Sequence, residues 1–74
     1  MEEKILEVLK NTFGLEEIDM TISQQTCEAW DSMGQLNLVV DLEETFDICL
    51  EPDEIGQMKN FDDIVRILKT KGLE

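Results

Sequence analysis

The spacing of apolar residues divides the 74-residue chain into helical segments separated by polar connections. Near the start of the chain, apolar side chains recur every three or four positions, which predicts a helix over residues 2–13. Gly14 follows, where a helix commonly ends in the left-handed conformation. The predicted buried stripe comprises Ile5, Leu6, Leu9 and Phe13. Nothing on this helix suggests chemistry, so we expect its role to be structural.

A second helix is predicted over residues 32–46, the longest amphipathic segment of the chain. Ser32 has the residue type of an N-cap, and Gln35 stands three positions later. This spacing predicts a capping box, in which the Ser32 hydroxyl and the Gln35 side chain each accept a backbone N–H. Met33 and Val40 fall outside the core stripe and are candidates for contact with a partner. The stripe expected to face the core comprises Leu36, Val39, Leu42 and Phe46.

The segment between these helices, residues 15–31, shows no sustained periodicity. A loop of this length is unusual in a small domain and is often functional. Its scattered apolar residues predict that it is held against the helices, with a short extra helical turn near Glu16 or Ser23 as an alternative. These apolar residues are Ile18, Met20, Ile22, Cys27, Ala29 and Trp30.

Residues 47–50 are apolar enough for a short strand, but the chain has no second run to pair with them. We therefore expect an extended connection with Ile48 turned inward. Pro52 then suits the first turn of a short helix over residues 52–58. Asp53 falls in that turn, where an acidic side chain favours the positive end of the helix.

A last helix is predicted over residues 61–71. Asn60 is its expected N-cap, with Asp63 at the position of a capping partner, and Gly72 ends it. Its predicted buried stripe comprises Phe61, Ile64, Val65 and Leu68. The pattern as a whole predicts one domain over residues 1–74, a small all-α bundle of three principal helices and one short helix.

The formal net charge is −12, from 18 acidic and 6 basic residues, and the hydrophobic fraction is 42%. A hydrophobic fraction of this size is typical of a folded domain. Because phosphate binding needs clustered Lys and Arg, the composition excludes nucleic acid as a direct partner. The acidity instead favours docking to basic patches on other proteins.

The two cysteines, Cys27 and Cys49, are too few for a disulfide scaffold and do not have metal-binding spacing. We expect both to be reduced and partly buried, and a bridge between them is an alternative. The opening Met1-Glu2-Glu3 is acidic and no long apolar run follows it, so we expect neither a secretory leader nor a membrane span. These features predict a cytoplasmic monomer.

The chain has no His and no Tyr, so neither cysteine has a histidine to activate it. Its many solvated carboxylates do not form the paired acid and base that hydrolysis requires. The sequence contains no Gly-rich phosphate loop and no calcium-binding loop. We therefore expect a protein that is not itself an enzyme and that binds no metal.

The sequence Asp31-Ser32-Met33 resembles the Asp-Ser-Leu signature of acyl carrier proteins, whose Ser carries 4′-phosphopantetheine. The resemblance continues through Leu42-Glu43-Glu44-Thr45-Phe46, which is similar to the end of the second helix in that family. It continues again in Pro52-Asp53-Glu54-Ile55 and in the helix from Phe61 to Leu68. It therefore covers essentially the whole chain, including its length, its acidity and its long first loop.

The resemblance implies that Ser32 receives 4′-phosphopantetheine from coenzyme A and carries acyl groups as thioesters. It also implies three kinds of partner: a phosphopantetheinyl transferase, an acyl-loading ligase or transferase, and downstream pathway enzymes with basic docking patches. The pathway implied is fatty-acid-like, polyketide-like or otherwise specialised. The residues that partners would read are Asp31, Met33, Val40, Glu43 and Glu44.

Two positions depart from the pattern of this family. Gly34 and Asn37 stand where members that serve fatty-acid synthesis commonly carry acids, which favours a dedicated pathway partner. Trp30 has two interpretations, as an anchor for the loop or as a platform beside the prosthetic arm. An aminoacyl, peptidyl or D-alanyl carrier using the same Ser32 is an alternative function. An unmodified acidic interaction module, in which Ser32 is only a helix cap, is another.

Overall fold

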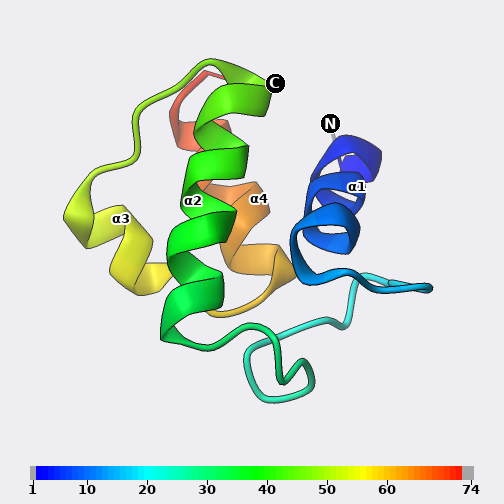
Figure 1. Cartoon of the computed structure of the whole chain (residues 1–74). Helices are drawn as coiled ribbons and strands as arrows, with labels where there is room; N and C mark the ends of the chain where they lie inside the picture. Colours follow the sequence, from blue (N-terminus) through cyan, green and yellow to red (C-terminus); the bar gives the residue numbers. More distant parts are fainter. Residues whose placement is uncertain (1, 73–74) are drawn as a thin grey trace.

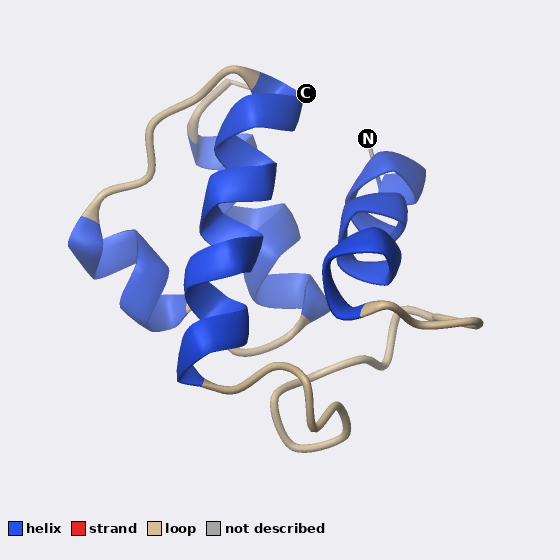
Figure 2. Cartoon of the chain, viewed as in Figure 1, coloured by secondary structure: helices blue, strands red, loops and turns tan. Residues whose placement is uncertain are grey.

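The computed structural model describes residues 2–72, and these residues form four helices and no strand. The helices are α1 (Glu2–Phe13), α2 (Ser32–Phe46), α3 (Pro52–Gln57) and α4 (Phe61–Thr70). Loops make all the connections, and the longest joins α1 to α2 (Figure 2). The predicted all-α fold class is confirmed. The predicted bounds of α1 and α2 are also correct, while α3 and α4 each end one residue earlier than predicted.

The core lies among α1, α2 and α4, with α3 at the side of the bundle (Figure 1). No polar or charged residue is buried within the described part of the chain, so apolar packing alone fills the centre. The large side chains that are almost completely buried are Ile5, Leu9, Leu38, Leu42, Met58, Phe61, Ile64 and Leu68. The stripe predicted for α4 is confirmed in full.

The orientation predicted for α2 is partly wrong. Leu36 was expected in the core, but it is 59% exposed, and Leu38 is buried in its place. The cause is that apolar residues lie on several sides of α2, so their spacing fits more than one orientation. Phe46 is half-buried against the core cluster.

Helices α1 and α2 are each followed at the C-terminal end by a residue in the left-handed conformation. Gly14 has a φ of 64°, and the Leu15 N–H donates to the Lys10 carbonyl at 3.0 Å, as the sequence predicts. At the end of α2, Asp47 takes the same conformation, with a φ of 54°. Asp adopts this conformation more readily than most side chains do.

The long loop is held against the rest of the bundle, as predicted. The Gln24 N–H donates to the Lys59 carbonyl at 2.9 Å, and the Phe61 N–H donates to the Ile22 carbonyl at 3.1 Å. These two bonds join the loop to the connection between α3 and α4. The alternative of a short extra helical turn is realised at Ser23 only as one hydrogen-bonded turn over residues 23–27, in which the Cys27 N–H donates to the Ser23 carbonyl at 3.0 Å.

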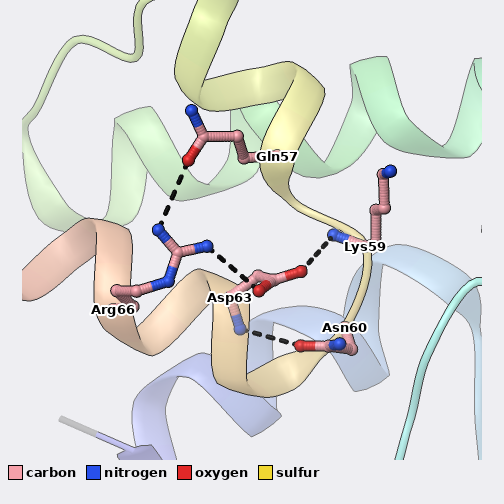
Figure 3. Close-up of polar contacts among 5 residues, drawn as sticks. All are labelled: Gln57, Lys59, Asn60, Asp63 and Arg66. Carbon is pink, nitrogen blue, oxygen red and sulfur yellow. Dashed lines mark hydrogen bonds and ion pairs between the residues drawn. The ribbon is translucent and has the colours of Figure 1, made fainter.

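The predicted N-cap of α4 is also confirmed (Figure 3). The Asn60 side-chain oxygen accepts the Asp63 N–H at 2.8 Å. The Asp63 carboxylate accepts the backbone N–H of Lys59 at 3.2 Å and pairs with the Arg66 guanidinium at 3.0 Å. Arg66 also donates to the side-chain oxygen of Gln57 at 3.3 Å, which ties the end of α3 to α4.

The two cysteines are both free thiols, Cys27 buried and Cys49 exposed, so the alternative of a bridge between them is not realised. The longest helix, α2, has 15 residues. Within residues 2–72, no helix combines the length and the apolar character that crossing a bilayer would require.

Candidate functional site at the start of α2

Asp31, rather than Ser32, is the N-cap of α2. Its backbone is extended, with φ −97° and ψ −164°, and its Oδ1 accepts the Gly34 N–H at 2.8 Å. The Asp31 carbonyl also accepts the Gln35 N–H at 2.8 Å, which places Ser32 in the first helical position. The predicted capping box of Ser32 and Gln35 is therefore wrong. Asp and Ser are both good N-caps, and the sequence alone did not separate two adjacent candidates.

Ser32 is exposed, and its hydroxyl makes no hydrogen bond with any residue of the described chain. Its backbone is fixed in the first turn of a 15-residue helix, so its position is set by the fold. The hydroxyl is thus presented at the positive end of α2 without a structural partner. A chemical group attached to its oxygen would break no contact of the native structure.

Gln35 makes two side-chain contacts that the sequence did not predict. The Trp30 indole N–H donates to its Oε1 at 2.6 Å, and its Nε2 donates to the Ile55 carbonyl at 2.7 Å. One amide therefore joins the end of the long loop, the first turn of α2 and the middle of α3. Its oxygen accepts while its nitrogen donates, a combination that an amide side chain provides.

Trp30 is an anchor for the loop. Its side chain is only 2% exposed, and its ring lies 5.5 Å from the ring of Phe13 at an angle of 32°. A tilted aromatic pair at this distance is attractive. With its indole N–H bonded to Gln35, Trp30 fixes the residue that immediately precedes Asp31. These contacts favour the anchor over the alternative of an exposed platform.

Gly34 is buried on the inner side of α2, which corrects its sequence-based interpretation. A Cβ on Gly34 would lie 2.0 Å from the Ala29 carbonyl oxygen and 3.1 Å from the Phe13 ring. No acid could occupy this position in this fold, so Gly34 does not report on how the exposed face of α2 is charged. Asn37 does lie on the exposed surface.

Three apolar side chains form an exposed row along α2, which we call the apolar stripe: Met33, Leu36 and Val40, exposed by 69%, 59% and 50%. Exposure of Met33 and Val40 was predicted, whereas Leu36 was missed. The spacing of three and then four residues could have shown that the three share one face of a helix. The stripe begins directly beside Ser32.

The acidic residues expected at the site do not all face solvent freely. Glu44 is exposed, one helical turn after Val40. The Glu43 carboxylate instead accepts the Leu50 N–H at 2.9 Å and is half-buried. Asp31 is exposed, but its carboxylate is engaged as the helix cap. Of the predicted recognition residues, Met33, Val40 and Glu44 are the most available to a partner.

An open groove of about 610 Å³ lies beside Ser32. It runs between α2 and α3, and we call it the α2–α3 groove. Its lining includes Ser32, Leu36, Ile55 and Lys59. The Lys59 side chain points away from the Asp63 carboxylate, to which its backbone is bonded (Figure 3). The groove thus combines apolar side chains with polar ones, and its charged lining residues are Lys59 and Asp31.

Glu54 of α3 has a pKa below its ordinary value. The main cause is its bond to Lys71, whose Nζ lies 2.8 Å from the Glu54 carboxylate, and the N–H of Glu51 adds to the effect. This contact joins α3 to the residue that follows α4. No group of three side chains suited to a metal ion occurs within the described residues.

No protein-family model and no curated protein sequence matches this chain. Its function is therefore inferred from the start of α2: an exposed Ser32, a cap supplied by Asp31, and the adjoining groove and apolar stripe.

Proposed function

We propose that this chain is an acyl carrier protein whose Ser32 is the attachment site for 4′-phosphopantetheine. The observation that carries the proposal is that Asp31, and not the neighbouring Ser32, caps the helix. Asp31 caps α2, so the Ser32 hydroxyl has no structural duty that would explain its presence. A serine that served only as a helix cap would make the bond that Asp31 makes here.

The surroundings of Ser32 also fit a phosphate-linked arm. The positive end of α2 favours a phosphodiester on the Ser32 oxygen. The α2–α3 groove offers the apolar side chains of Leu36 and Ile55 to the arm. When attached, the arm supplies a terminal thiol that holds an acyl group as a thioester. The protein supplies the fixed position of Ser32 and a surface that partner enzymes recognise.

The apolar stripe and the acidic surface around it support recognition by other enzymes. Three large apolar side chains in one exposed row are unusual on a chain whose net charge is −12. A partner with an apolar patch surrounded by Lys and Arg would complement them. Such partners would be the transferase, the loading enzyme and the enzymes that take the acyl group onward.

Intact mass spectrometry tests the proposal directly. The chain is incubated with coenzyme A and a promiscuous phosphopantetheinyl transferase, and one adduct per molecule is expected. Ser32→Ala should gain none, and Ser23→Ala, which removes another hydroxyl from the preceding loop, should gain the same adduct as the wild type. An unmodified wild type, or an adduct that persists in Ser32→Ala, would refute the proposal.

Loading assays then separate the proposed acyl carrier from an aminoacyl, peptidyl or D-alanyl carrier. The modified protein is offered acyl and aminoacyl adenylates by enzymes that make each, and the thioester is measured by mass. We expect acyl transfer. Exclusive aminoacyl transfer would keep Ser32 as the attachment site and replace the acyl cargo.

A further inference from the structure

The short helix α3 is unusual in how it is held. None of its six residues is buried, whereas each of the other three helices buries at least three residues. Ile55 packs against the core while half-buried, and it is the one apolar residue of α3 placed to do so. Burial within α3 is therefore limited to Ile55, while Leu50 and Met58, which lie just before and just after the helix, are buried in the core. These flanking residues hold the two ends of α3, and polar contacts add to the position of the helix between them.

Besides the local bond from the Glu51 N–H to the Glu54 carboxylate, three polar side-chain contacts join α3 to other elements of the described chain. Two of them reach the α4 side: Glu54 pairs with Lys71 at 2.8 Å, and Gln57 accepts from Arg66 at 3.3 Å. The Arg66 side chain is 54% exposed, so solvent screens its contacts. The third contact, from Gln35 to the Ile55 carbonyl, is at 2.7 Å and reaches the α2 side.

The Gln35 contact spans the α2–α3 groove, of which Gln35 and Ser32 are both lining residues. The same amide also accepts the indole N–H of Trp30, which is almost fully buried and fixes its orientation. The Gln35 side chain therefore bridges two segments: its oxygen accepts from Trp30 in the loop, and its nitrogen donates to the Ile55 carbonyl of α3. Its bond fixes how far α3 lies from the first turn of α2.

We propose that Gln35 is a positioning residue that latches α3 across the groove beside Ser32. The latch sets the width of the groove and the surface that a modifying enzyme meets around the Ser32 hydroxyl. The latch itself is a property of the unmodified chain. Its effect on Ser32 modification rests on the function proposed above.

The test compares two substitutions that add the same charge to the same helix. Gln35→Glu keeps an oxygen that accepts from Trp30, but an ionised carboxylate has no hydrogen to donate to the Ile55 carbonyl. Asn37→Asp adds one negative charge at an exposed position of α2 that makes no side-chain contact with α3 in the described chain. Only the first should release α3.

Amide hydrogen exchange on the unmodified protein is the first measurement. In Gln35→Glu we expect exchange within residues 52–57 to quicken by about fivefold, the effect of losing one neutral hydrogen bond. Residues 61–70 serve as an internal reference and should not change. The Trp30 indole N–H should stay protected in Gln35→Glu and lose protection in Gln35→Leu. Unchanged exchange in α3, or an equal increase in Asn37→Asp, would overturn the latch.

Steady-state kinetics of modification is the second measurement. Because the latch shapes the surface that is bound, Gln35→Glu should raise the KM for this protein about fivefold and leave kcat unchanged. Asn11→Asp, which adds the same charge at an exposed position of α1 instead of α2, should leave both constants near those of the wild type. Equal KM values in the two variants would show that Gln35 does not position the surface around Ser32, even if amide exchange in α3 is faster. A wild type that accepts no arm would refute the proposed function, while hydrogen exchange would still decide on the latch.

Discussion

Helices α2 and α4 are both amphipathic, but they use their apolar residues differently. Every apolar residue of α4 is buried. In α2, Leu38, Val39 and Leu42 are buried while the apolar stripe of Met33, Leu36 and Val40 faces solvent. Packing therefore accounts for the sequence of α4. It accounts for four of the seven apolar residues of α2, because Phe46 also packs against the core, and the three residues of the apolar stripe point to a role at the surface.

The sharpest way to break this comparison is to truncate one apolar residue in each helix. Ile64→Ala removes a side chain with no exposure and should cost about 2–5 kcal/mol of unfolding free energy. Leu36→Ala removes an exposed side chain and should change stability by no more than about 0.5 kcal/mol. Urea unfolding measures both. A loss above about 1 kcal/mol for Leu36→Ala would mean that the stripe belongs to the core.

A second comparison concerns two helical glycines. An alanine at position 34 would place its Cβ against the Ala29 carbonyl, so Gly34→Ala should destabilise the protein by about 1–3 kcal/mol. Gly56 of α3 has open space around it, and Gly56→Ala should stabilise the protein by about 0.5–1 kcal/mol. Thermal unfolding gives both signs. If Gly34→Ala were stabilising, the close contact between α2 and the loop would be wrong.

The caps of the two helices can be compared in the same way. Asp31→Ala and Asn60→Ala each remove a side chain that accepts a helix N–H, and each should cost about 1 kcal/mol. Ser32→Ala should change the free energy of unfolding by less than about 0.5 kcal/mol, because the Ser32 hydroxyl does not cap. Urea unfolding separates these cases. If Asp31→Ala and Ser32→Ala lowered the free energy of unfolding equally, Ser32 would also act as a cap.

The smallest effect concerns α3 and depends on pH. The pKa of Glu54 lies below its ordinary value of 4.5, chiefly because of Lys71. Its ionised form therefore stabilises the fold above pH 4.5, and this contribution disappears as the pH falls through the lowered pKa. Glu54→Gln should be slightly less stable than the wild type at neutral pH, and the difference should narrow in acid. A difference that is constant with pH would contradict this account.

Local signals in the sequence were sufficient for much of the fold. The stop of α1 at Gly14 and the start of α4 at Asn60 each depend on a residue type with one strong preference. The orientation of α4 was equally predictable, because its apolar residues occupy one face only. Such features are determined within a few neighbouring residues.

The site was less predictable because it depends on contacts between distant segments. The need for glycine at position 34 comes from the approach of Ala29 and Phe13, and the bonds of Gln35 depend on where Trp30 and α3 lie. The attachment role of Ser32 stays a prediction, and its assignment as the cap was wrong. Two adjacent residues of the capping type leave that choice to the tertiary structure.

The backbone bonds that tie the long loop to the α3–α4 connection also have a consequence for the order of folding. Gln24 bonds to Lys59, and Phe61 bonds to Ile22, so the loop acquires its native partners only after the C-terminal third of the chain is in place. Because contacts between residues this far apart carry a loop-closure cost, we expect them to form after the local contacts of the helices. During synthesis, Ser32 is made before Lys59 and Phe61, whose bonds hold the loop that precedes it. A modifying enzyme that requires the ordered surface would therefore act only on the completed fold.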